Sequence, residues 1–384
     1  MANQIATSAF SHFGSGAIKC LAEALKINEY QRVLVITDTS TVKDGAAKKV
    51  VNILVKNRVV YQVYDRINTA CTVNDVRHIV EMAKAFRADV IVGVGSGAVM
   101  DASKAAAVLL SNPEISDPRK LEGSNKAKKH SFPLYLVFAS CGNARGFGFV
   151  ILLEDEAQRK KIECLEYHAV ADAVICDSDI FTGAASKDFA VSSMALIASA
   201  IEALVCKESW VISDFNALEA IRIISQNVKS AVKGTASAKE QIIYGQYLAG
   251  LAVSNSGAGL ATAMSNALEA THGVSAKISS VALMPSVMAF NSPSSGSKFK
   301  DVAIALGAKI STTAKPDSYR KSAIAAFEKL AKDLGIPAKI DGLELSKDDL
   351  DFLSENVLKS CYFASNPKVA SKKKVMDLYK ELAK

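Results

Sequence analysis

The stretch Gly93-Val94-Gly95-Ser96-Gly97-Ala98-Val99-Met100-Asp101-Ala102-Ser103-Lys104 decides the fold. It follows an apolar run typical of a buried strand, residues 90–94, and it opens a segment with helical spacing, residues 100–110. A glycine-rich turn at such a junction lets the backbone approach a pyrophosphate, and the helix N-terminus adds N–H donors and positive potential. The same kind of turn also occurs without a ligand. On its own it indicates a tight strand-to-helix connection and a candidate phosphate site.

Alternating strands and helices surround this turn. The first half of the chain predicts short apolar strands at residues 33–36, 59–64, 90–94 and 134–138, with helices at residues 43–55, 74–86 and 100–110. Strands separated by helices of roughly 10–15 residues form βαβ units and a parallel sheet. From Phe189 onward the apolar residues recur at helical spacing instead. We therefore expect an α/β, Rossmann-like, dinucleotide-binding domain over residues 1–182 and an all-α helical domain over residues 183–384.

Composition and charge narrow the function classes. Of the 384 residues, 49% are hydrophobic and 22% are charged, which is typical of a globular protein with a sizeable core. The net charge of +7 comes from scattered lysines without interleaved aromatic residues, so we expect no nucleic-acid partner. We see no leader-like N-terminus and no run of about 18 uncharged apolar residues, so we expect no membrane association. The seven cysteines include no C-x-x-C pair, and we expect reduced thiols in a cytoplasmic protein.

The glycine-rich stretch resembles the signature Gly-Gly-Gly-Ser-x-x-Asp-x-x-Lys of the iron-containing alcohol dehydrogenase superfamily. Its spacing is closest to the glycerol dehydrogenase branch; Asp101 and Lys104 match, and Ser96 replaces one glycine. Residues 284–291 are similar to the family's Leu-Pro-x-Val-Met-x-Phe-Asn, and shorter matches extend the resemblance over nearly the whole chain. The resemblance implies a dehydroquinate synthase-like architecture. It also implies NAD(P)-dependent interconversion of a small alcohol and an aldehyde.

A dinucleotide site follows from the same resemblance. Asp38, at the end of the first expected strand, looks like the family's adenosine-ribose position. A carboxylate there accepts hydrogen bonds from ribose hydroxyls and repels a 2′-phosphate, which favours NAD over NADP. A plain turn or helix cap is the alternative for Asp38. The expected cofactor-binding residues are Asp38, Gly93, Gly95, Ser96, Gly97, Asp101, Lys104, Ser140 and Gly142.

One cofactor segment departs from the family. The loop Thr-Thr-Ala-Gly-Thr-Gly-Ser-Glu, which contacts the nicotinamide half in the family, reads Ala-Ser-Cys-Gly-Asn-Ala-Arg-Gly at residues 139–146. Arg145 either pairs with a phosphate or fills the space of the cofactor, and both alternatives stay open. Cys141 is either a nucleophile or a small residue at the family's alanine position, and the second interpretation is the simpler one.

The family's catalytic metal has no ligands in this sequence. The motif Gly-Met-Asp-Ala-Leu-Thr-His supplies an Asp and a His in the family, and Gly-x-x-His-Ala-Met-x-His and Pro-His-Gly supply two more His ligands. Alanine has no donor atom, and a neutral hydroxyl is a poor ligand for a divalent transition metal. We therefore expect that no metal binds. The four ligand positions are Ala195, Ser199, Thr262 and Ala276, and Asn266 stands at a nearby active-site histidine.

His272, His168 and Lys104 are the candidate proton donors for a reaction without metal. His272 opens a His-Gly-Val run that lies four residues earlier than in the family, so it is either a ligand restored by compensating gaps or a satisfied local histidine. We favour the local histidine, since one ligand does not make a metal site.

Two function hypotheses remain. The first is a metal-independent oxidoreductase, although losing a Lewis acid that contributes several kcal/mol costs many powers of ten in rate. The second is a catalytically inactive paralogue that binds a nucleotide or acts as a structural or partner subunit. Both hypotheses permit a homo-oligomer or an association with an active family member. A third hypothesis, an unrelated reaction in the same cleft, is supported by no motif in the sequence.

Overall fold

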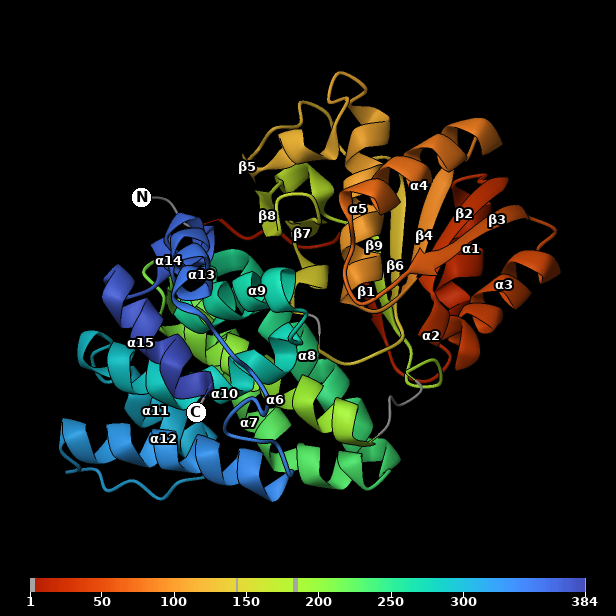
Figure 1. The fold of residues 1–384 in the computed structure, drawn as a ribbon. Coiled ribbons are helices and arrows are strands. Elements are labelled where there is room, and N and C mark those ends of the chain that lie inside the picture. Colours follow the sequence, from red (N-terminus) through yellow and green to blue (C-terminus); the bar gives the residue numbers. More distant parts are fainter. Residues whose placement is uncertain (1–3, 143, 182–185, 384) are drawn as a thin grey trace. The chain divides into compact units, whose positions relative to one another are not determined.

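The computed structural model describes residues 4–142, 144–181 and 186–383 (Figure 1). The described residues form two compact units, residues 5–181 and residues 186–383. We call them the sheet domain and the helical domain. The expected boundary between residues 182 and 183 falls outside the described residues.

A parallel six-stranded sheet organises the sheet domain, as the alternating pattern predicts. Its strand order is β1-β9-β6-β4-β2-β3, and all its neighbouring strands pair in parallel. Every residue of β4 is buried, as expected for a central strand of a parallel sheet that is covered on both faces. The strands are β1 (Phe10–Phe13), β2 (Arg32–Asp38), β3 (Val60–Ile67), β4 (Val90–Gly95), β6 (Leu134–Phe138) and β9 (Ala173–Cys176).

The helices of this domain follow the strands, with two differences from the expected ranges. The helix expected at residues 43–55 begins only at Ala46, after Gly45 with a left-handed φ of 79°, and a short helix that was not expected, Thr39–Lys43, precedes it. The helix expected from Met100 begins at Gly97, directly after β4, so its N-terminus belongs to the glycine turn. The helices are α1 (Lys19–Ile27), α2 (Thr39–Lys43), α3 (Ala46–Lys56), α4 (Val73–Phe86) and α5 (Gly97–Ser111).

A second, three-stranded sheet is present that the sequence reasoning did not predict. Its strands β7 and β8 are antiparallel, and β5 pairs in parallel with β8. In the chain, short 3-10 helices precede β5 and β7 and follow β8. The elements are β5 (Gly123–Ser124), β7 (Val150–Asp155), β8 (Lys160–Leu165), η1 (Pro118–Leu121), η2 (Arg145–Phe147) and η3 (Tyr167–Ala169).

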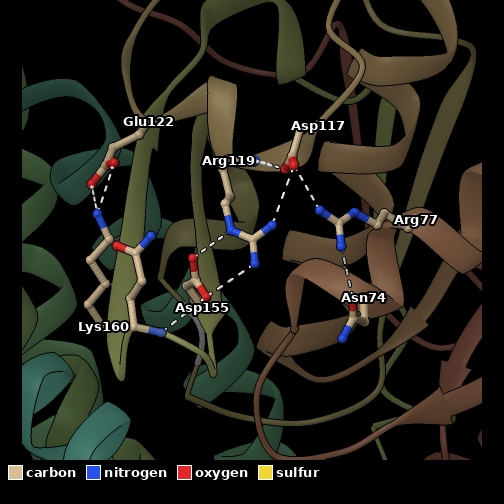
Figure 2. Close-up of polar contacts among 8 residues, drawn as sticks. Asn74, Arg77, Asp117, Arg119, Glu122, Asp155 and Lys160 are labelled. Carbon is tan, nitrogen blue, oxygen red and sulfur yellow. Dashed lines mark hydrogen bonds and ion pairs between the residues drawn. The ribbon is translucent and has the colours of Figure 1, made fainter.

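Ion pairs join the small sheet to the rest of the domain (Figure 2). Arg119 of η1 donates from Nε to Asp155 Oδ2 of β7 at 2.6 Å. Arg77 of α4 donates from Nη2 to Asp117 Oδ2 at 2.8 Å, and Arg119 also reaches Asp117. The Arg119 hydrogen bond holds the pKa of the Asp155 carboxyl below its usual range. These contacts tie α4, η1 and β7 together.

The described part of the helical domain has no strands, as the change of period predicts. The helical spacing expected from Phe189 onward corresponds to this series of helices. The elements are α6 (Ser186–Val205), α7 (Val211–Val232), α8 (Ala236–Ser256), α9 (Leu260–His272), α10 (Ala276–Asn291), η4 (Ser292–Ser294), α11 (Lys298–Ala305), α12 (Pro316–Asp333), α13 (Lys347–Lys359), α14 (Cys361–Ser365) and α15 (Lys372–Ala383).

Helix α6 is the most apolar helix of this domain. Its stretch Lys187–Val205 is long and apolar enough to cross a membrane by length and composition, although it contains the charged residues Asp188 and Glu202. However, 89% of its most apolar window is buried inside the fold. Helices α7, α8 and α10 pack against it, so its apolarity is that of a core helix.

Candidate functional site

The sheet-domain part of the candidate site is the turn between β4 and α5. Gly95 has a φ of 154°, and a Cβ there would lie 2.7 Å from Asp38 Oδ2. A Cβ at Gly93 would clash with Ser103 Oγ of α5, so this glycine lets the helix pack closely on the sheet. Ser96 is the N-cap residue of α5 but makes no side-chain cap hydrogen bond. First-turn N–H groups at such an N-terminus suit a phosphate, so the turn fits a dinucleotide.

The carboxylate of Asp38 accepts hydrogen bonds from three groups of the sheet domain. Its Oδ1 accepts from Thr41 N at 2.8 Å and from Ser40 Oγ at 3.0 Å, so it caps α2. Its Oδ2 accepts from Ser96 N at 3.2 Å. The helix-cap alternative therefore describes what this carboxylate does in the structure. It also ties the end of β2 to the glycine turn, and a role in reading the ribose stays a prediction.

Lys104 is fully enclosed by the protein. Its Nζ donates to the carbonyls of Arg145 at 3.1 Å and Gly148 at 3.3 Å, and to the carbonyl of Val150. Asp101 Oδ1 lies 3.9 Å from the same ammonium. Burial lowers the pKa of Lys104 to about 8. These contacts make Lys104 a clamp on residues 145–150, and its role as a proton donor stays a prediction that burial disfavours.

The altered loop packs against α5. Arg145 Nη2 donates to Asp101 Oδ2 at 3.2 Å, so the structure gives this guanidinium a carboxylate partner that the sequence reasoning did not foresee. Cys141 is buried, and Gly142 has a φ of 103°. Ser140 is half-buried, while its neighbour Asn143 lies outside the described residues. Neither alternative for Arg145, a phosphate contact or occupation of the cofactor space, is tested by this geometry.

The four family ligand positions lie on three helices of the helical domain that contact one another. Ala195 and Ser199 are on α6, Thr262 is in the first turn of α9, and Ala276 is the first residue of α10. Thr262 Oγ1 donates to Glu202 Oε2 at 2.6 Å, so its hydroxyl is already engaged. The three helices that carry these positions are therefore present, but two of the four side chains have no donor atom and the other two offer only hydroxyls.

Glu202 of α6 is the buried acid of this region. Its Oε1 accepts from Ala261 N at 2.6 Å and its Oε2 from Thr262 N at 3.1 Å. It thus satisfies two N–H groups at the N-terminus of α9. Burial raises the pKa of its carboxyl. Glu202 acts as a side-chain cap for α9.

The residues present do not fit the family's metal. Among the described residues, no group of three or more His, Cys, Asp or Glu side chains lies close enough to hold a metal ion. His272 Nδ1 lies 2.7 Å from Thr271 Oγ1, and its Nε2 lies 3.6 Å from Asp349 Oδ1 of α13. These contacts fit the alternative in which His272 is a histidine satisfied by its neighbours and not a restored metal ligand. His168 packs edge-on against His130 in the sheet domain, at 4.8 Å between ring centroids.

The sequence reasoning missed one cation in this region. Lys277, the second residue of α10, donates from Nζ to Ser192 Oγ of α6 at 3.0 Å. It directly follows the ligand position Ala276 and stands where the family's Pro-His-Gly motif has its glycine. The sequence does contain a signal for this residue. A lysine stands at the glycine position of the motif, directly after the position of the metal ligand.

The two domains and the glycine turn define a class of two-domain protein with a dinucleotide-type sheet and a helical second domain. The family model "Iron-containing alcohol dehydrogenase" matches residues 9–178, and the model "Fe-containing alcohol dehydrogenase family, C-terminal" matches residues 189–383. The chain therefore belongs to the iron-containing alcohol dehydrogenase family.

Relatives match over almost the full length. Lactaldehyde reductase from Escherichia coli is 28% identical over 379 residues, with 99% of each chain covered. 1,3-Propanediol dehydrogenase from Klebsiella pneumoniae is 25% identical, with 96% of each chain covered. A solved structure of a 1,3-propanediol oxidoreductase has a TM-score of 0.94 at 24% identity and covers 100% of both chains. This structure supports the fold, and the named relatives give no support to the hypothesis of an inactive paralogue.

Proposed function

We propose that the protein is an NAD(P)-dependent oxidoreductase that interconverts a small aldehyde and its alcohol without a bound transition metal. The observation that carries the proposal is a contrast within one chain. The glycine turn retains a backbone suited to a pyrophosphate, whereas Ala195, Ser199, Thr262 and Ala276 offer no ligand set. A nicotinamide cofactor, when bound, supplies or accepts the hydride.

The chain's own residues have defined tasks in this proposal. First-turn N–H groups of α5 bind the pyrophosphate, and Asp38 holds the turn in shape through Ser96. Asp38 lies beside the ribose and favours NAD over NADP. The relatives are named for lactaldehyde and 1,3-propanediol, which supports a short aldehyde or alcohol as the substrate.

Location and assembly belong to the same proposal. All seven cysteines are free, which supports a reducing compartment such as the cytoplasm. We expect a homo-oligomer, or an assembly with an active family member. Size-exclusion chromatography with light scattering measures this state directly.

The test begins with protein that has been treated with EDTA and analysed for metal. NADH and NADPH are titrated by calorimetry, and reduction of lactaldehyde, 3-hydroxypropionaldehyde and acetaldehyde is then followed at 340 nm. We expect NADH to bind with a Kd on the order of micromolar and at least one aldehyde to be reduced. Chelation should change neither the melting temperature nor the rate.

Two results contradict the proposal in different ways. If neither nucleotide binds, the protein is no dehydrogenase, and the inactive-subunit hypothesis takes its place. If reduction appears only after Fe²⁺ or Zn²⁺ is added, the reaction depends on metal, and only the metal-free part of the proposal fails.

A further inference from the structure

We propose that the helical domain binds an α-amino acid with an apolar side chain in a cavity between α10, α12 and α15. The inference goes beyond the proposed function, because it concerns a further binding site and no step of the reaction. Every residue that carries it belongs to the helical domain.

The cavity is part of the packed domain. Its volume of about 540 Å³ is within the range of small-molecule sites. Helix α10 packs against both α12 and α15 (Figure 1), and residues 336–339 line the cavity together with these three helices. Backbone hydrogen bonds hold this segment on both sides. Ile336 N donates to Ala331 O of α12 at 3.0 Å, and Ile340 N donates to Leu382 O of α15 at 3.2 Å.

The floor of the cavity is apolar. A hydrocarbon group of a ligand is stabilised at such a surface because it leaves water. A ligand without an apolar part would gain nothing from this floor. The buried side chains that line the cavity are Val281, Leu283, Phe327, Ile336, Leu378 and Leu382.

One polar group interrupts the apolar lining. Helix α10 contains Pro285, which has no N–H, so the carbonyl of Val281 lacks the donor that a helix normally supplies from four residues further on. A helical carbonyl points toward that later residue, and both Val281 and Pro285 line the cavity. The Val281 oxygen is therefore a hydrogen-bond acceptor in the cavity wall. A ligand with an N–H or O–H donor would satisfy it.

The rim of the cavity carries charges of both signs. Glu328 and Lys332 are one turn apart on α12. Glu381 is on α15, and Lys339 is in the segment after α12. All four side chains are exposed. Two carboxylates and two ammonium groups give the rim no net charge, so it favours a ligand with both signs over a simple anion or cation.

An α-amino acid with an apolar side chain combines these three features. Its side chain fits the floor, and its ammonium has three N–H donors for the Val281 oxygen and a rim glutamate. Its carboxylate pairs with a rim lysine. A fatty acid has no donor for Val281 at neutral pH, and a neutral alcohol makes no use of the rim charges.

The first experiment titrates L-phenylalanine into the full-length protein by calorimetry, without nucleotide or aldehyde. We expect a Kd on the order of 0.1–1 mM, as is usual for a ligand of this size. Three analogues lack the carboxylate, the ammonium or both: 2-phenylethylamine, 3-phenylpropionate and 2-phenylethanol. Each should bind at least about threefold more weakly. L-Serine, which lacks the apolar group, should bind at least about tenfold more weakly.

Ala331→Trp tests the location of the site. Ala331 is half-buried on α12 and lines the cavity, so an indole there should fill the space and lower the affinity for L-phenylalanine at least about tenfold. Ala326→Trp is the matched control, because Ala326 is half-buried on the same helix but lines a different groove. It should leave the Kd within about twofold. Ala331→Leu replaces Ala331→Trp if the latter does not fold.

Pro285→Ala separates a ligand contact from a structural role. Alanine restores the N–H donor to the Val281 carbonyl, so the melting temperature should rise. The affinity for L-phenylalanine should nevertheless fall at least about threefold, because the acceptor is then occupied. Pro316→Ala is the control, since Pro316 is the first residue of α12, where no donor is required. It should leave the Kd within about twofold.

Three results would overturn the inference. The first is no binding of L-phenylalanine at about 10 mM. The second is equal binding by Ala331→Trp and the unchanged protein, which would place the ligand elsewhere. The third is binding of 2-phenylethanol as tight as that of L-phenylalanine, which would make the cavity a site for neutral apolar molecules. The proposed function is independent of all three, since nucleotide titration and aldehyde reduction test it.

Discussion

The β4–α5 turn and the α6–α9–α10 cluster have departed from their family to different degrees, and the reason is physical. The turn depends on backbone geometry, and the same glycines are needed for packing: a side chain at Gly93 would clash with α5. The cluster depends on side chains that project from intact helices. Ala195 and Ala276 remove ligands without disturbing α6 or α10. A site built from side chains can thus be replaced while its scaffold persists, whereas a site built from backbone is retained with the fold.

The largest expected effect tests the backbone side of this comparison. Gly95→Val places a Cβ 2.7 Å from Asp38 Oδ2 and 2.9 Å from Val99 Cγ2, at a φ of 154°. We expect the free energy of unfolding to fall by about 3 kcal/mol and NADH affinity to fall at least tenfold. Urea unfolding and NADH calorimetry measure these two quantities.

Gly45→Ala is the control for this variant, since Gly45 also has a positive φ but nothing lies within 4 Å of its added Cβ. It should cost about 1–2 kcal/mol through strain alone and leave NADH affinity unchanged. An unaltered NADH affinity in Gly95→Val would remove the link between the turn and the nucleotide.

An intermediate effect tests the scaffold of the helical cluster. Glu202→Gln keeps the shape of the side chain, but its amide nitrogen cannot accept from the N–H groups at the start of α9. We expect a loss of about 1–3 kcal/mol in the free energy of unfolding, measured with urea. Ser199→Ala, on the same face of α6, should change it by less than about 0.5 kcal/mol. Equal effects of both variants would mean that Glu202 does not cap α9.

The smallest effect concerns the ion pair between Arg119 of η1 and Asp155 of β7 in the sheet domain. The pKa of Asp155 is held down by Arg119, so the carboxylate stabilises the fold at pH values above its unfolded pKa and ceases to do so as the pH falls through the folded pKa. Asp155→Asn should cost about 1 kcal/mol at pH 7, since Arg119 is partly solvated. It should also flatten the acid dependence of the urea midpoint below about pH 4.

Asp65→Asn, which changes an exposed carboxylate of the same domain, is the reference for this measurement. Should both variants show the same acid dependence, the Arg119–Asp155 pair contributes nothing to stability.

The fold was predictable because the periodicity of apolar residues is local information. Buried strands such as β4 and the long helices carry it clearly. The small sheet was missed because β8 alternates charged and apolar residues over only six positions, Lys160 to Leu165. The short helix α2 was missed because its five residues, Thr39 to Lys43, are too few to show an apolar helical pattern.

The candidate site was predictable only where a motif contains it. The missing ligands could be read from the motifs directly. The pairing of Arg145 with Asp101, and that of Lys277 with Ser192, joins residues 44 and 85 positions apart and depends on how helices pack. The ribose role of Asp38 stays a prediction, whereas its contact with Ser96, 58 residues further along the chain, could not be read from the sequence.

The apolar core helix α6 has a consequence for biosynthesis. It precedes in sequence the helices that cover it, and the last residue of α10 is Asn291. About 90 residues must therefore be added after α6, which takes roughly 4–17 s at ribosomal speeds of about 5–20 residues per second. During that interval α6, a segment with the apolarity of a membrane span, can pack against α7 and α8 as they emerge but lacks its contacts with α10. Chains that stop between α6 and α10 will be the species that chaperones must hold and that aggregate most readily.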